Sequence, residues 1–275
     1  MRHVGLKLRM AVVGSILFAF YGVAAVVLMG MFGTDVFPLV VVGSVAFVGV
    51  QYKLGKWMAL RSVGAEDLPE DRYTEIHRRV ESLSRDMGID KPRLMIARMG
   101  VPNAFAVGRK GAGTVVVSQE LLRTLEPDEV EGVLAHELAH IRNRDVVMMV
   151  LGQGVASIVA IVAQWAVLLT GDNDLADFFL AIIVGQLTQM LVMLFVFAIS
   201  RYREYVADAD AAREVGSGEP LASALEKISR SAERREDAGV DDQVNALCIF
   251  GDGGGLANLL STHPPVEKRI ERLRS

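Results

Sequence analysis

The sequence predicts a mainly α-helical integral membrane protein, with four transmembrane helices in two hairpins and a cytoplasmic α+β domain that carries a small sheet. The 275-residue chain is 51% hydrophobic with a mean hydropathy of +0.33, which is too apolar for an ordinary soluble domain. Four long runs contain no charged residue. The segments between the two hairpins and after the last run show strand-like or amphipathic patterns, as expected for a folded domain.

The first hairpin is predicted at residues 1–57, with spans at about 10–32 and 36–52. The first run has 23 residues without a charge, which is long enough to cross a bilayer and too long for the core of a cleaved signal peptide. The turn between the runs carries only Asp35. Basic residues flank both outer ends: Arg2, Lys7, Arg9, Lys53, Lys56 and Arg61. By the positive-inside rule, both ends of the hairpin are cytoplasmic.

The second hairpin is predicted at residues 146–199, with spans at about 146–169 and 178–199. Its turn holds three Asp residues and no Lys or Arg, and Arg201 and Arg203 follow the last span. A buried core hairpin is the alternative, but two uncharged runs of this length between basic ends favour membrane spans. The sequence therefore predicts a multi-pass protein of the cell membrane, in contact with the lipid bilayer, with both termini in the cytoplasm.

The remaining residues, 58–145 and 200–275, are expected to form the two parts of the cytoplasmic domain. In the first part, the local sequence predicts a linker at 53–66, a helix at 71–87 capped by Gly88, and strands at 93–97 and 114–118.

Residues 101–107 are predicted to form an edge strand, because Pro102 lacks the N–H that an inner strand would need. An extended peptide can add to such an edge as a further strand. Asn103 and Ala104 are therefore candidate substrate-binding residues. A simple hairpin that closes a small sheet explains the local sequence equally well.

The segment Leu134–Asn143 reads LAHELAHIRN and supplies the strongest chemical signal. On a helix, His136 and His140 lie one turn apart on the same face, so both imidazoles can bind one metal ion. Glu137 lies beside the first histidine, where its carboxylate can reach a water molecule. This H-E-x-x-H pattern is typical of zinc peptidases, which makes the domain zincin-like with Glu137 as the catalytic base. The alternative is a helix that merely carries exposed histidines opposite an apolar face.

A zinc peptidase needs a third protein ligand, and Glu204 is the candidate. His140 and Glu204 lie about 9 Å and 7.5 Å beyond the ends of two antiparallel spans, so they are expected at similar depth. Asp208, one turn after Glu204, is then placed to accept a hydrogen bond from a ligand histidine. A solvated acidic helix face is the simpler alternative.

Other features narrow the possible functions. The net charge is −4 and no basic stripe is present, which argues against nucleic acid as a partner. The single cysteine, Cys248, excludes an internal disulfide. Residues 238–260 are Gly-rich or polar and suggest a mobile loop. His263 precedes two prolines, and the local sequence alone favours an ordinary turn residue.

Taken in order, these motifs resemble the HtpX-type family of membrane zinc metalloproteases, heat-shock relatives of the CAAX prenyl proteases. The resemblance covers nearly the whole chain: the N-terminal hairpin, NAFA at 103–106, HELAH at 136–140, the second hairpin, REYVAD at 203–208 and STHPP at 261–265.

The resemblance implies a zinc endopeptidase in the quality control of damaged or misfolded membrane proteins. His136, His140 and Glu204 match the ligands of one zinc ion, and Glu137 matches the base. Asn103 and Ala104 match the substrate-binding strand, and His263 matches a residue that assists the tetrahedral intermediate. Arg269 is a further candidate for oxyanion or structural support. A CAAX-type prenyl protease and a catalytically silent membrane adaptor are the competing interpretations, and the oligomeric state and substrates stay open.

Overall fold

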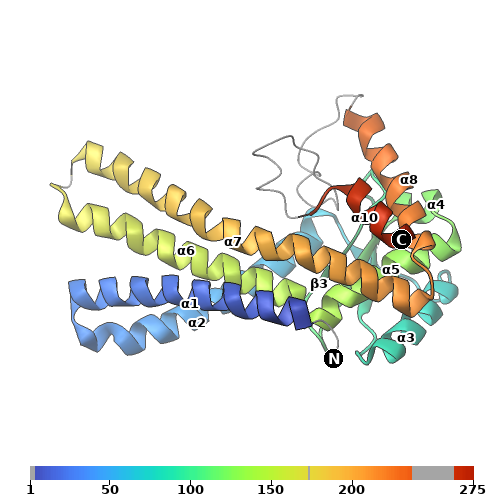
Figure 1. The fold of residues 1–275 in the computed structure, drawn as a ribbon, viewed down its shortest axis with the longest axis horizontal. Coiled ribbons are helices and arrows are strands. Elements are labelled where there is room, and N and C mark those ends of the chain that lie inside the picture. The colour runs from blue at the N-terminus through green and yellow to red at the C-terminus, as the bar shows by residue number, and fades with distance from the viewer. Residues whose placement is uncertain (1–3, 173, 237–262) are drawn as a thin grey trace. The chain divides into compact units, whose positions relative to one another are not determined.

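The computed structural model of the protein describes residues 4–172, 174–236 and 263–275 (Figure 1). The chain divides into two compact units. One comprises Met1–Gly55 and Met148–Ile199, and the other comprises Lys56–Val147 and Ser200–Ser275. Both are rich in helices, and the sheet found in the described part of the chain lies in the second unit.

The first unit is built from four long helices, three of which extend into the residues of the second unit. They are α1 (Val4–Phe32), α2 (Phe37–Ser62), α6 (Asp145–Thr170) and α7 (Leu175–Val215), and a short 3-10 helix, η1 (Thr34–Val36), joins the first two. Each of the four is long and apolar enough to cross a membrane. Large apolar side chains such as Phe18 and Leu39 are more than 70% exposed, as expected where a helix faces lipid.

Two of these helices differ from the expected span limits. Helix α2 continues to Ser62, so much of the predicted 53–66 linker is helical. Helix α7 continues to Val215, well beyond the apolar run that ends at residue 199. Charged residues end a membrane span, but they do not end a helix, because Lys, Arg and Glu are good helix formers.

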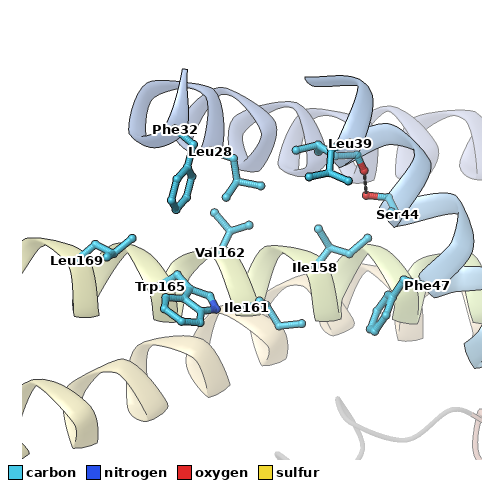
Figure 2. A pocket seen from close by; sticks show the side chains of 12 residues that line it. Leu28, Phe32, Leu39, Ser44, Phe47, Ile158, Ile161, Val162, Trp165 and Leu169 are labelled. Carbon is cyan, nitrogen blue, oxygen red and sulfur yellow. Dashed lines mark hydrogen bonds between the residues drawn. The ribbon is translucent and has the colours of Figure 1, made fainter. Parts of the chain in front are cut away.

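Close helix packing in the first unit depends on small residues. A Cβ atom at Gly152 of α6 would lie 2.7 Å from a methyl carbon of Val196 in α7, so only glycine permits this approach. Beside the bundle core, a cavity of about 580 Å³ lies between α1, α2 and α6 (Figure 2). Its lining is apolar apart from groups such as Ser44, whose hydroxyl donates to the Val40 carbonyl at 2.7 Å. Such a surface suits a lipid environment.

The second unit contains a four-stranded mixed sheet. Its strands are β1 (Glu66–Asp67), β2 (Arg93–Ala97), β3 (Ala104–Val107) and β4 (Thr114–Ser118), in the order β1-β2-β4-β3. Strands β2 and β4 are parallel, and β1 and β3 add antiparallel at the two sides. Strand β3 is thus an edge strand of this sheet, as predicted for residues 101–107, although Pro102 lies just before the strand rather than within it.

Five further helices of the second unit lie among the residues that the structure describes: α3 (Thr74–Met87), α4 (Gln119–Thr124), α5 (Pro127–Asn143), α8 (Glu219–Glu236) and α10 (Val266–Arg274). Helix α5 packs against α3, α8 and β3. Its apolar face, formed by Leu134, Leu138 and Ile141, is at most 1% exposed and lies in the main core. This packing fixes the rotation of α5 and therefore the direction of its opposite, polar face.

Candidate metal centre

Helix α5 is held at its start by a capping box in which Glu126 and Glu129 each accept from the other's backbone N–H. Glu129 is also buried and accepts from Ser223 at 2.6 Å and Lys227 at 2.7 Å, which ties α5 to α8. The helix that carries the H-E-x-x-H motif is thus fixed at its N-terminus as well as along its apolar face.

The motif side chains are buried rather than solvated. His136 and Glu137 are only 3% and 4% exposed, and the side chain of His140 is 15% exposed. The alternative of a helix with exposed histidines is therefore wrong. Helix α7 brings in Glu204, which is also 4% exposed, and a solvated acidic face is wrong for this residue too.

Three donor atoms from the two helices converge. The Nε2 atoms of His136 and His140 are 3.0 Å apart. One oxygen of Glu204 lies 3.5 Å from the first nitrogen, and the other lies 3.3 Å from the second. Within the described residues these three side chains form a group that can hold one metal ion.

The donor set fits zinc in both chemistry and spacing. Imidazole nitrogen and carboxylate oxygen are zinc ligands at about 2.0–2.2 Å, and two ligands of a tetrahedral ion at that distance lie about 3.3–3.6 Å apart. The separation of 3.0 Å between the two Nε2 atoms is slightly shorter than this edge length, and each nitrogen lies within that range of a different oxygen of Glu204, at 3.3 and 3.5 Å. Three protein donors also leave a fourth position for water or substrate.

The ring of His136 is held by Asp208, the residue that the sequence places one turn after Glu204. Its Nδ1 lies 3.0 Å from a carboxylate oxygen of Asp208, so Nε2 is the ring nitrogen that faces the other donors. Arg269 of α10 in turn binds both oxygens of Asp208 at 2.9 and 2.7 Å. Its Nη1 also lies 3.2 Å from Glu204, and the residue is 0% exposed. Arg269 is thus enclosed among the carboxylates that support the donors.

The second histidine has an equivalent series of partners. Nδ1 of His140 lies 2.6 Å from Asp145, and Nε of Arg203 lies 2.6 Å from the other oxygen of the same carboxylate. Neither Asp145 nor Arg203 is among the residues that the sequence suggests for the site. Asp145 looks like the last charge before a membrane span, and Arg203 looks like an ordinary basic flank.

These carboxylates favour protonation of both histidines in the metal-free protein. Burial and the neighbouring His140 oppose protonation of His136, but Asp208 and Glu204 outweigh them and raise its pKa. Burial likewise opposes protonation of His140, but Glu204 and Asp145 raise its pKa well above the usual value. Protons therefore compete with a metal ion for this site.

Glu137 lies next to the donors and contacts the edge strand. The backbone N–H of Ala106 in β3 donates to its carboxylate. Burial raises the pKa of Glu137, although the two histidines act in the opposite direction. A carboxylate with a raised pKa is a better proton acceptor near neutral pH, which is the property required of a general base.

The strand register shows which groups β3 offers on its open side. The Ser118 N–H donates to the Asn103 carbonyl at 2.8 Å, and the Asn103 N–H donates to the Ser118 hydroxyl at 2.9 Å. Backbone groups alternate along a strand, so Ala104 and Ala106 direct theirs toward the free edge. Asn103 itself is 1% exposed, so its side chain is part of the folded core.

His263 is brought to the same centre. Its Nδ1 lies 3.2 Å from Glu204, and its side chain is 26% exposed. It is therefore more accessible than the other groups around the donors. Cys248 and the whole of the predicted 238–260 loop, by contrast, lie outside the described residues.

Comparison with known proteins places this geometry in a family. Residues 70–275 match the model of peptidase family M48. The chain belongs to this family. It is 64% identical to a "Protease HtpX homolog" of Halobacterium salinarum, over 97% of this chain and 100% of that protein. It is 41% identical to a "Protease HtpX homolog" of Thermococcus sibiricus, over 76% of each.

The family membership confirms the HtpX-type resemblance and makes this M48 chain a membrane-associated metalloprotease. Among solved structures, S. mikatae Ste24p is similar, with a TM-score of 0.60 and 20% identity. The match covers 97% of this chain and 63% of the Ste24p chain. At this identity, the similarity shows a common fold alone.

Proposed function

We propose that the protein is a zinc-dependent endopeptidase that holds one zinc ion per chain through His136, His140 and Glu204. The observation that carries the proposal is the convergence of these donors, from two helices far apart in the sequence, beside the buried carboxylate of Glu137. Zinc in such a site acidifies a water molecule and polarises a carbonyl group.

Glu137 is proposed to be the general base. Its carboxylate accepts the proton of the attacking water and then transfers that proton to the leaving amine. The Ala106 N–H keeps the carboxylate at the edge strand, beside the proposed substrate position. The raised pKa of Glu137 allows the group to hold the proton between the two transfers.

The proposed substrate lies as an extended strand along the open edge of β3. Ala104 offers backbone groups for pairing, and the backbone N–H and carbonyl of Asn103 hold the start of the strand against Ser118. The buried side chain of Asn103 is proposed to position this edge for the substrate. Asn103→Ala is expected to lower kcat/KM while the zinc content stays unchanged. Unchanged kcat/KM would remove this edge from the site.

His263 is proposed to assist the oxyanion, because it is the accessible basic group at the centre. Arg269 is proposed to support the structure. It is fully buried and its guanidinium is already bound by two carboxylates, which leaves it poorly suited to meet a substrate.

Membrane proteins that are damaged or misfolded are the proposed substrates, cleaved at the cytoplasmic face. Four apolar helices support an arrangement with four spans. The basic flanks of both hairpins, together with their acidic turns, support cytoplasmic placement of the termini and the active site.

The two alternatives are less well supported. A CAAX-type activity is disfavoured by the 64% identity to a Protease HtpX homolog along nearly the whole chain, compared with 20% identity to Ste24p. A silent adaptor would have no need for three convergent donors and a buried base.

The experiment is a zinc measurement on detergent-purified protein, combined with casein cleavage before and after chelation. The proposal predicts about one zinc per chain, loss of cleavage on chelation and recovery when zinc is restored. Cleavage that persists in fully metal-free protein would overturn it.

A further inference from the structure

The contact between His140 and Asp145 depends on a break between two helices. In a continuous helix, residues five apart lie about 140° apart around the axis, so their side chains would diverge. Here Arg144 adopts a left-handed conformation with φ 58° and ends α5, and α6 begins at Asp145. It is the one residue other than glycine with positive φ among those the structure describes. The break turns the Asp145 carboxylate back toward the ring.

Asp145 has a second partner, the buried Arg203, which fixes the position of its carboxylate. Arg203 is 2% exposed, and its guanidinium binds one oxygen of Asp145 through Nε at 2.6 Å and through Nη2. A buried arginine requires a counter-charge, because an unpaired charge in the interior is costly. The remaining oxygen of Asp145 is then directed at Nδ1 of His140 at 2.6 Å.

This arrangement matches the support of the other histidine. His136 contacts Asp208, which in turn contacts Arg269. In the same way, His140 contacts Asp145, which in turn contacts Arg203. In both cases, a carboxylate oxygen lies against Nδ1 of the ring, at 3.0 Å for His136 and 2.6 Å for His140, and this contact favours the tautomer with a free Nε2 lone pair.

We propose that Asp145, held by Arg203, is a positioning residue that orients His140 and fixes its tautomer for metal binding. The proposal rests on the zinc site of the proposed function, since it concerns one ligand of that site. The proposal gives a role to Asp145, the first residue of α6, and to Arg203, which directly precedes Glu204.

The chain offers a matched control. Asp210 of α7 is 0% exposed and pairs with Arg142 of α5 and Arg213, and Asn143 donates to it at 3.2 Å. Asp210→Asn therefore disturbs a buried carboxylate that joins α7 to α5, without touching a ligand histidine. It separates general loosening of the fold from an effect on His140.

The test compares Asp145→Asn, Asp210→Asn and the unmodified full-length protein in detergent. Zinc affinity is measured by chelator competition, and ligand geometry is followed by the visible absorption of the Co²⁺-substituted protein. Asp145→Asn should weaken zinc binding by about 10–100-fold and change the Co²⁺ spectrum. Asp210→Asn should leave both readouts as in the unmodified protein, even where it lowers the melting temperature.

Equal zinc affinity and an unchanged Co²⁺ spectrum in Asp145→Asn would overturn the proposal, and so would an equal loss in both variants. If Asp145→Asn does not fold, Arg203→Lys is measured in its place. This variant should show a smaller loss of zinc affinity together with an altered Co²⁺ spectrum. Unchanged zinc affinity and an unchanged spectrum in Arg203→Lys would refute the positioning role of Asp145. Unmodified protein that binds no zinc, or His140→Ala with full zinc affinity, would overturn the ligand assignment itself.

Discussion

Replacing Arg269 separates two roles that its position at the candidate metal centre allows: structural support of the site and direct contact with the oxyanion. The guanidinium is fully buried and neutralises Asp208 and Glu204, whose side chains are 5% exposed. Arg269→Met keeps much of the volume but leaves both carboxylates without their cation. Breaking a buried ion pair in this way costs about 3–5 kcal/mol. For a unit of this size, that loss corresponds to a fall in melting temperature of roughly 6–20 °C.

The assay is thermal unfolding of metal-free protein in detergent, with steady-state cleavage measured well below the melting temperature. Arg274→Met is the control, because Arg274 also contacts two carboxylates but does so at the surface. This control should shift the melting temperature far less, since exposed ion pairs contribute little. An unchanged melting temperature for Arg269→Met together with a large loss of kcat would refute structural support and favour direct contact with the oxyanion.

Three further predictions concern the helix break, the metal site and the topology. Arg144 is exposed with φ 58°, so Arg144→Gly should keep or raise stability by up to about 1 kcal/mol, whereas Arg144→Val should lower it by about 1–2 kcal/mol in thermal unfolding. The reverse order would contradict a left-handed break. Because the pKa of His140 is raised, its protonated form persists to higher pH. Zinc affinity, measured by chelator competition, should therefore fall as the pH decreases through the neutral range. A zinc affinity that does not change with pH would contradict this. In a background without Cys248, Asp174→Cys should react with an impermeant thiol reagent from outside intact cells and Ser217→Cys should not; the opposite pattern would place the active site outside.

Much of the metal centre could be predicted from spacing alone. His136 and His140 share a helix face because they are four residues apart, and the same spacing links Glu204 with Asp208. These relations are local, so they do not require knowledge of the tertiary fold. The edge position of β3 was likewise predictable, because a proline beside a strand excludes an inner place in the sheet.

The supporting residues could not be predicted in the same way. The contact of Asp145 with His140 requires a left-handed residue at Arg144, and arginine carries no signal for that conformation. Arg203 follows an apolar run, and the positive-inside rule already accounts for a basic residue at that place. Nothing in the sequence therefore indicates its buried contact with Asp145. Such pairings arise only when α5, α6 and α7 are placed in three dimensions.

The central claim is that His136, His140 and Glu204 bind the metal while Glu137 moves the proton, and Glu137→Gln tests it most directly. Gln has nearly the same size as Glu but cannot accept the proton, so cleavage of casein should fall by roughly 100-fold or more. Zinc content should stay near one per chain, whereas Glu204→Ala should lose both zinc and activity. A Glu137→Gln protein that lacks zinc, or that retains full activity with zinc bound, would contradict the account.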